Sequence, residues 1–259
     1  MEIVNDFLVN ALQPISSFES ALIKSLEQDY GFEAGALSNG NMGLHPSDIN
    51  IAVWTRYGGV VASRNESLYT LINKTVTDHK GQNYIELENN LNNTLTLNYL
   101  TAPFSLDVLL YHPGTDYLIP QDNKWEVEEI DPLEFYPDND DPEVVPRIKH
   151  IYGVRDGSTV VARAWCNYPR DLDGFSSYAI GVGTHVDHRG KGLGKAVVSA
   201  LLERVTKESG IPLWNCQVSN LASLKLARSV GFQECAWTVY WNESNGYFNM
   251  QKLNEATNE

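Results

Sequence analysis

A glycine-rich stretch with basic side chains, residues 189–196, has the residue types best suited to binding chemistry in this chain. It follows an alternating run, residues 178–184, that predicts a strand, and it precedes residues 197–208, whose apolar spacing predicts a helix. Glycines let a backbone approach a ligand closely, and the first N–H groups of a helix have no partner within it. Together with the helix dipole, these groups favour an anion such as a phosphate or pyrophosphate.

Spacing distinguishes three kinds of phosphate loop. A P-loop would need glycine where the chain has Arg189 and a hydroxyl residue where it has Ala196. A dinucleotide fingerprint starting at Gly190 would need a third glycine at the position of Lys195. The pattern that fits is Arg-x-x-Gly-x-Gly, beginning at Arg189. This is the pyrophosphate loop of the GNAT acyltransferases, which the sequence resembles.

The chain on either side of the loop extends the resemblance. Residues 213–218 predict a strand, residues 221–230 a helix, and residues 235–241 a further strand. The family pattern Asn-x-x-Ala/Ser-x-x-Leu-Tyr-x-x-x-Gly-Phe is matched by Asn220, Ser223, Leu226, Gly231 and Phe232. Upstream, residues 151–165 predict a hairpin that turns at Asp156 and Gly157. The resemblance covers roughly residues 124–241.

The resemblance implies an α/β (α+β) fold with a mixed, mostly antiparallel sheet flanked by helices. It also implies acetyl-CoA as co-substrate, with Val182, Gly183 and Thr184 along the pantetheine arm. The pyrophosphate would lie against Arg189, Gly190, Lys191, Gly192, Leu193, Gly194 and Lys195. Arg189 either contacts the pyrophosphate or braces the loop, and Asn220 either touches the cofactor or serves only as a helix N-cap. No metal is expected.

The usual catalytic side chains of the family are replaced here. Tyr178 and Asn215 stand where the fourth and fifth strands often carry a glutamate, and Ala227 stands at the usual tyrosine position. Tyr178 and His185 are the substitutes we consider for proton transfer, although a tyrosine pKa near 10 makes a poor base. Ordered water with no dedicated base is the other alternative.

The first half of the chain carries no motif with chemistry. We predict domains 1–116 and 117–259, the first an α/β half that is either a degenerate GNAT-like copy or an unrelated lid. Its predicted helices span residues 3–12, 18–26, 68–76 and 85–97, and its predicted strands span residues 51–55, 59–62 and 106–111. It has no second Arg-x-x-Gly-x-Gly, so one cofactor site is expected. This arrangement, a half without a cofactor motif joined to a half that has one, resembles the subgroup containing the zwittermicin A resistance acetyltransferase.

Composition narrows the partners. A formal net charge of −14 argues against nucleic acid and favours a cationic acceptor. Residues 126–143 contain acidic residues and prolines but no Lys or Arg, which predicts an irregular segment, either plainly solvated or a rim that attracts cations. The cysteines lack metal or redox spacing, and neither a signal peptide nor a membrane span is evident, so we expect a cytoplasmic protein.

The leading interpretation is an N-acetyltransferase that transfers an acetyl group from acetyl-CoA to the primary amine of a small, cationic acceptor. An amine-bearing antibiotic, in a resistance role, or a polyamine-like metabolite would fit. The alternatives are an acyl-CoA-binding regulatory or sensor protein with little turnover and a protein or peptide N-acetyltransferase. The acceptor and the oligomeric state cannot be derived from the sequence.

Overall fold

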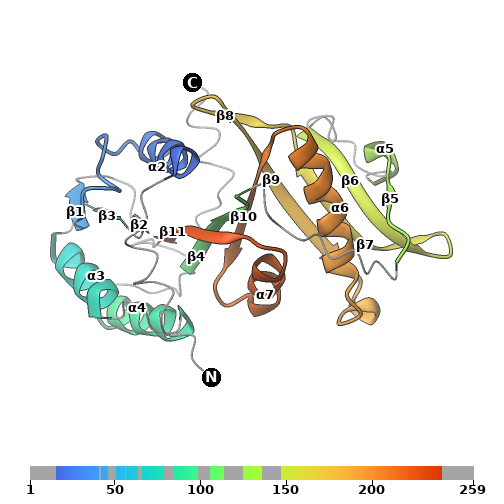
Figure 1. The fold of residues 1–259 in the computed structure, drawn as a ribbon. Helices are drawn as coiled ribbons and strands as arrows, with labels where there is room; N and C mark the ends of the chain where they lie inside the picture. The colour runs from blue at the N-terminus through green and yellow to red at the C-terminus, as the bar shows by residue number, and fades with distance from the viewer. Residues whose placement is uncertain are drawn as a thin grey trace. The chain divides into compact units, whose positions relative to one another are not determined.

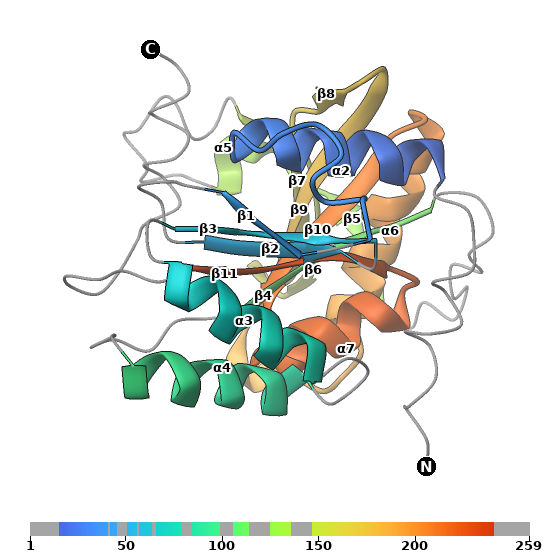
Figure 2. The same cartoon turned by 90° about the vertical axis from the view of Figure 1, so that its left-hand side faces the viewer.

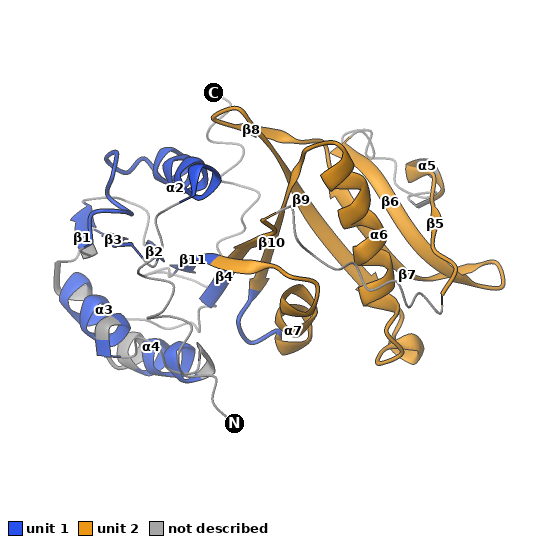
Figure 3. Ribbon diagram, viewed as in Figure 1, with its two compact units in different colours: residues 1–108, 217–220, 235–259 blue, residues 109–216, 221–234 orange. Residues whose placement is uncertain are grey.

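The computed structural model describes residues 16–40, 42–45, 51–55, 57–63, 66–78, 84–98, 106–113, 125–135 and 147–240. The chain divides into two compact units, residues 1–108, 217–220 and 235–259 in unit 1 and residues 109–216 and 221–234 in unit 2 (Figure 3). The domain boundary predicted between residues 116 and 117 lies outside the described residues. In the parts of the chain described, no helix is long and apolar enough to cross a membrane.

Unit 1 is built on a mostly antiparallel set of strands. These are β1 (Met42–His45), β2 (Ile51–Thr55), β3 (Gly59–Ala62) and most of β11 (Gln233–Tyr240). β3 pairs with β1 in parallel and with β2 in the antiparallel sense, and β2 pairs with β11 from Ala236 to Tyr240. This last pairing places the C-terminal strand in the first unit, because it completes the sheet begun by the N-terminal half.

Helices cover both faces of the unit 1 strands (Figure 2). Helix α2 (Ser17–Asp29) packs on one face, where Ile23 joins a core with Ile51, Val53 and Val60. On the other face lie α3 (Glu66–Asp78) and α4 (Tyr84–Asn98), side by side. Strand β4 (Leu106–Tyr111) follows. Unit 1 is therefore α/β, as predicted, and the idea that it is a degenerate copy of the same fold stays a prediction.

Unit 2 contains the sheet that carries the glycine-rich loop (Figure 1). Its strands are β5 (Glu128–Glu129), β6 (Ile148–Asp156), β7 (Thr159–Asn167), β8 (Arg170–Leu172), β9 (Phe175–Thr184) and β10 (Ile211–Gln217). Strands β5, β6, β7 and β9 pair in that order and all antiparallel, β8 pairs with β9, and β10 joins β9 in parallel. The predicted mixed, mostly antiparallel sheet flanked by helices is confirmed.

Within its described residues, unit 2 has one long helix and three shorter helical segments. They are α5 (Pro132–Phe135), the 3₁₀ turn η2 (Val186–His188), α6 (Leu193–Lys207) and α7 (Leu221–Ser229). Helix α6 packs on β6, β7 and β9 and contacts α7. The hairpin predicted at Asp156 and Gly157 is confirmed, since β6 ends at Asp156 and Gly157 turns with φ +60°.

Most predicted elements of the first half correspond to observed ones. The strands predicted over residues 51–55, 59–62 and 106–111 have the observed bounds of β2, β3 and β4. The helices predicted over residues 18–26, 68–76 and 85–97 lie within α2, α3 and α4, which extend beyond them at both ends. The helix predicted over residues 3–12 lies outside the described residues.

Candidate functional site

The turn between β9 and α6 carries the glycines of the predicted anion loop. Gly190 and Gly192 have φ angles of +76° and +85°, in the left-handed region that favours glycine. A Cβ built on either residue would meet nothing within 4 Å, so the backbone here is open to a bound molecule. Gly192 is the N-cap of α6, and the helix begins at Leu193 rather than at Val197, where we predicted it. Glycine's low helix propensity hid this first turn in the sequence.

The first turn of α6 is electrostatically suited to an anion. The first intrahelical hydrogen bond runs from the Ala196 N–H to the Gly192 carbonyl, at 3.1 Å, so the preceding N–H groups have no acceptor within the helix. The turn holds no acidic residue, and Lys191 and Lys195 lie at its start. Cations at a helix N-terminus oppose the dipole unless an anion is present. The residues therefore fit a pyrophosphate group.

Two side-chain hydrogen bonds hold the loop in place. Arg189 Nε donates to the carbonyl of Thr184 at 3.2 Å, which is the bracing role considered for this residue. Trp125 Nε1 donates to the carbonyl of Lys191, also at 3.2 Å. Both bonds use carbonyl groups, one at the end of β9 and one in the loop, so they do not consume the N–H groups of the loop.

Strands β9 and β10 separate next to this loop. Their pairing covers only Ser177 to Ala179 of β9 against Ile211 to Leu213 of β10, whereas β7 pairs with β9 as far as Thr184. From Ile180 onward, β9 therefore has an edge that β10 does not pair. We call this region the β9–β10 fork. Exposed backbone groups along such an edge can pair with an extended ligand as an added strand does. The residues predicted to contact pantetheine, Val182 to Thr184, lie on this edge.

Helix α7 is fixed by the residues that matched the family pattern. Its C-terminus is a Schellman motif: the Phe232 N–H bonds the Ala227 carbonyl, the Gly231 N–H bonds the Arg228 carbonyl, and Gly231 has φ +97°. A Cβ on Gly194 would lie 3.2 Å from Leu226 Cδ2, so this glycine allows α6 and α7 to approach closely. Asn220 directly precedes α7, the position of an N-cap, and a contact of Asn220 with the cofactor stays a prediction.

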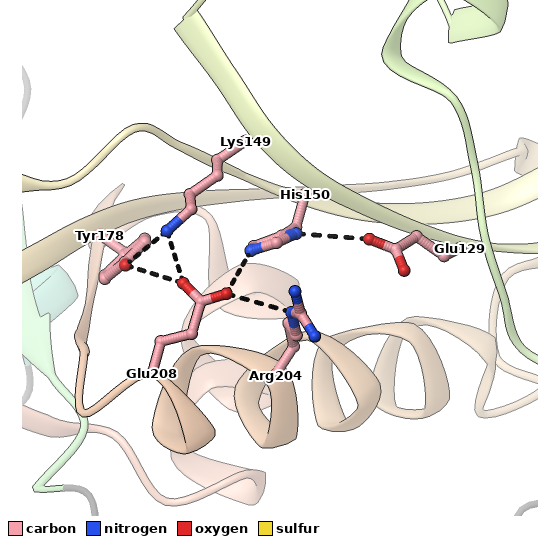
Figure 4. A network of polar contacts seen from close by, with 6 residues as sticks. All are labelled: Glu129, Lys149, His150, Tyr178, Arg204 and Glu208. Atoms are coloured by element: carbon pink, nitrogen blue, oxygen red, sulfur yellow. Dashed lines mark hydrogen bonds and ion pairs between the residues drawn. The ribbon is translucent and has the colours of Figure 1, made fainter.

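Tyr178 lies beneath the C-terminal end of α6. It is 2% exposed, and its hydroxyl donates to Glu208 Oε2 at 3.0 Å and accepts from Lys149 Nζ at 3.0 Å (Figure 4). Glycine is required at position 210 because a Cβ there would lie 2.3 Å from the tyrosine ring. The side chain thus joins β9 to the end of α6, and its hydroxyl is already occupied on both sides.

Glu208, the C-cap of α6, is the centre of this polar cluster (Figure 4). Its Oε2 accepts from Lys149 Nζ at 2.5 Å, and its Oε1 contacts His150 Nε2 at 2.9 Å and Arg204 Nε at 3.1 Å. The buried His150 also contacts Glu129 Oε1 through Nδ1, at 3.3 Å. We call these residues, with Tyr178, the α6 anchor. The anchor connects the helix to β5, β6 and β9.

The charges of the α6 anchor shift the acidities of its members. The hydrogen bond from Lys149 is the main cause that lowers the pKa of Glu208 from 4.5 to about 2, and those from Tyr178 and His150 add to it. The same carboxylate raises the pKa of Lys149. Burial raises the pKa of Tyr178, so even less of its hydroxyl is ionised near neutral pH than in a free tyrosine and less tyrosinate is available to accept a proton.

The lowered pKa of Glu208 predicts an acid-dependent loss of stability. A carboxyl whose pKa is depressed in the folded state stabilises the protein above its ordinary pKa, 4.5, and this contribution disappears as pH falls toward about 2. Urea unfolding at steps across this window should show the stability difference between the original chain and Glu208→Gln shrinking with acidification. A difference that stays constant from pH 6 to pH 2 would contradict the assignment.

His185 directly follows β9, so along the chain the glycine-rich loop separates it from α6. Its side chain is 56% exposed, its Nδ1 lies 3.6 Å from Asp187 Oδ2, and its backbone is the N-cap of η2. Of the two catalytic candidates, Tyr178 is thus buried under α6 and His185 is at the surface. A proton-transfer role for either one stays a prediction.

Helices α6 and α7 cover one face of the unit 2 sheet. Tyr178 faces α6, and its register partner Pro212 lies on the same face of the sheet. Trp214, two residues further along β10, lies on this face as well, and its Nε1 donates to Ser223 of α7 at 3.0 Å. The alternate residues turn to the opposite face, which we call the open face. At the fork, this open face carries Ala179, Gly181, Leu213 and Asn215. Ala179 and Asn215 are exposed there, whereas Ala227 is buried in α7.

Several carboxylates of the acidic segment after Trp125 have partners within the protein. Its described part, residues 125–135, contains the short elements β5 and α5, and residues 136–146 lie outside the described residues. Glu128 and Glu134 both pair with Arg155 of β6, and Glu129 contacts His150. These three carboxylates therefore have internal partners, which argues against a cation-attracting rim in the described part of the segment.

Sequence reasoning missed the members of the α6 anchor other than Tyr178. Glu208 was predicted only as the last residue of a helix, and Lys149 and His150 lie 59 and 58 residues before it. No local pattern relates such positions. The available signal was indirect: Gly210, which follows the helix, has to be small to admit the ring of Tyr178.

One comparison with known proteins covers the region of the loop and the fork. Residues 154–240, from β6 through β11, match the model of the GNAT acetyltransferase family. The match includes the fork, the loop and both helices that border it. This segment, about a third of the chain, is thus similar to the GNAT acetyltransferase family. No curated protein matches the chain.

Several solved structures are similar to the chain at low sequence identity. One is an acetyltransferase of the GNAT family from Colwellia psychrerythraea, 14% identical with a TM-score of 0.41, covering 63% of each chain. Another is a GCN5-related N-acetyltransferase-like protein from Streptococcus suis, 17% identical with a TM-score of 0.41, covering 73% of this chain and 71% of that one. The chain thus spans less than two thirds of the length of the Colwellia protein.

Proposed function

We propose that the protein is an acetyl-CoA-dependent N-acetyltransferase that acts on a small primary amine. The observation that carries the proposal is the adjacency of the α6 N-terminus and the β9–β10 fork. One supplies unpaired N–H groups and lysines for a pyrophosphate, and the other supplies an unpaired strand edge for an extended arm. The family match of residues 154–240 supports acetyl-CoA as the ligand.

In this proposal, each element of the site has one task. The N–H groups of Leu193, Gly194 and Lys195, with the side chains of Lys191 and Lys195, hold the pyrophosphate. The free edge from Val182 to Thr184 orients the pantetheine arm. Acetyl-CoA supplies the activated acyl group, and the fork positions the thioester where an amine can reach it from the open face. Positioning of this kind accounts for a large part of the rate enhancement.

In this proposal, water accepts the proton that the amine loses. The strand positions that often hold the base in this family have Tyr178 and Asn215, and the Tyr178 hydroxyl is held by Glu208 and Lys149. The rate should therefore rise with pH as the free amine fraction rises, without an acid limb from one side chain. Within the proposal, the acceptor is a small cationic amine of the cytoplasm, and amine-bearing antibiotics belong among the compounds to test.

Kinetics of two variants test the water-mediated route. We expect Tyr178→Phe and His185→Ala each to lower kcat/KM by about tenfold or less, whereas loss of a dedicated general base costs about 10²–10⁴-fold. The measurement is the pH profile of kcat/KM for each variant. A loss of several thousandfold in one of them, with acetyl-CoA affinity intact, would identify that residue as the base.

A cofactor sensor is the second candidate function. This candidate is favoured because the three positions that often carry catalytic groups in this family do not offer them here. The Tyr178 hydroxyl is bonded to Glu208, and Asn215 and Ala227 have neither a carboxylate nor a hydroxyl. Thiol release from acetyl-CoA, measured with polyamines, aminoglycosides, simple arylalkylamines and peptide amines, separates the two. Amine-dependent release supports the transferase. Tight acetyl-CoA binding with no release across the panel would support the sensor instead.

A further inference from the structure

We propose that the indole of Trp165 forms the wall of the acceptor site and selects acceptors whose amine is attached to a flat apolar group. This inference rests on the proposed function, because it assumes that the acceptor reaches the thioester at the β9–β10 fork. It is carried by the placement of Trp165 on the open face.

The indole lies across the backbone of β9. Trp165 of β7 is the register partner of Gly181. A Cβ built on Gly181 would lie 2.3 Å from Trp165 Cζ2 and 2.9 Å from Cη2, so the six-membered ring occupies the space that a side chain would take. Only glycine at position 181 permits this arrangement.

This ring stands directly beside the fork. Gly181 is two residues beyond Ala179, the last β9 residue that pairs with β10. On its inner side, the indole packs against the apolar cluster of Ile130, Ile148 and Ile151, which fixes its position. Trp165 is nevertheless only half-buried, so part of the residue is accessible to solvent.

The neighbours of the indole favour an apolar group over a second ammonium group. Around the fork, the positions of β7, β9 and β10 on the open face are Arg163, Trp165, Ala179, Gly181, Leu213 and Asn215. None of them is a carboxylate. Arg163 is exposed and extends over Gly183. An aromatic ring, by contrast, can stack on the indole in an offset or edge-to-face arrangement. We therefore expect a monoamine with an aromatic body to be preferred over a polyamine.

The test compares phenethylamine with putrescine, both binding to the full chain loaded with CoA. Calorimetry should show phenethylamine binding at least about tenfold more tightly, and Trp165→Leu should remove most of this preference while acetyl-CoA affinity is unchanged. Trp165→Phe should retain it. Trp214→Phe is the matched control, because Trp214 is a buried tryptophan on the opposite face and its variant should keep the preference.

Two results would overturn the inference. One is tighter binding of putrescine by the original chain, and the other is an undiminished preference in folded Trp165→Leu. If Trp165→Leu does not fold, Gly181→Ala, which displaces the indole, is measured in its place and should weaken phenethylamine binding. Because binding to the CoA complex needs no chemistry, failure of the proposed function is seen separately, as absence of thiol release from acetyl-CoA.

Discussion

Replacing Gly192 with valine should weaken acetyl-CoA binding by about 10- to 100-fold, measured by calorimetry on the folded variant. Gly192 has φ +85°, a conformation that costs a β-branched residue about 1–3 kcal/mol. The variant must therefore either strain or abandon the turn that presents the first N–H groups of α6. Its side chain would also occupy the open space beside the loop.

A matched control separates backbone strain from loss of the site. Gly174, at the tip of the β8–β9 hairpin, has φ +90°, and a Cβ built on it, like one built on Gly192, would meet no atom within 4 Å. Gly174→Val should lower stability to a similar extent and leave acetyl-CoA affinity unchanged. Equal affinity in Gly192→Val and the original chain would show that the cofactor does not bind at the α6 N-terminus.

The second large effect is expected at Glu208. Glu208→Ala should lower the free energy of unfolding by about 2–4 kcal/mol, because Lys149 and the buried His150 would lose the carboxylate that they contact. The 23% exposure of the Glu208 side chain lets water replace part of the interaction, which keeps the effect below that of a fully buried ion pair. Urea unfolding at pH 7 measures it.

The control for this prediction is another glutamate of the same helix. Glu203→Ala removes an exposed pair with Lys207, four residues later in α6, and should cost about 0.5 kcal/mol or less. If the two variants were equally stable, the α6 anchor would have no special role in fixing the helix to the sheet.

Local sequence signals were sufficient for the elements that position the site. Alternation of apolar residues predicted β9, and glycine spacing predicted the loop, because both depend on neighbouring residues. The predicted start of α6 was wrong by four residues because Gly192 and Gly194 suppress the helical signal at the point where the proposed anion site needs glycine. A pattern that is functional at a helix start can thus conceal the helix.

Long-range partners could not be predicted in the same way. The pairing of Trp237 with Trp54 brings β11 into unit 1, and nothing in either strand specifies the other. Likewise, the acidic residues Glu128 and Glu134 meet Arg155 only because β5 and α5 fold back on β6. Such contacts depend on topology, and the composition of the segment left open whether it was plainly solvated or a rim that attracts cations.

The central claim is that one acetyl-CoA binds per chain, with its pyrophosphate at the N-terminus of α6 and its pantetheine arm along the free edge of β9. A crystal structure of the full chain with acetyl-CoA tests it most directly. The account predicts pyrophosphate oxygens within hydrogen-bond distance of the N–H groups of residues 193–195 and the thioester at the β9–β10 fork. Acetyl-CoA bound elsewhere, or a second molecule bound to unit 1, would contradict it.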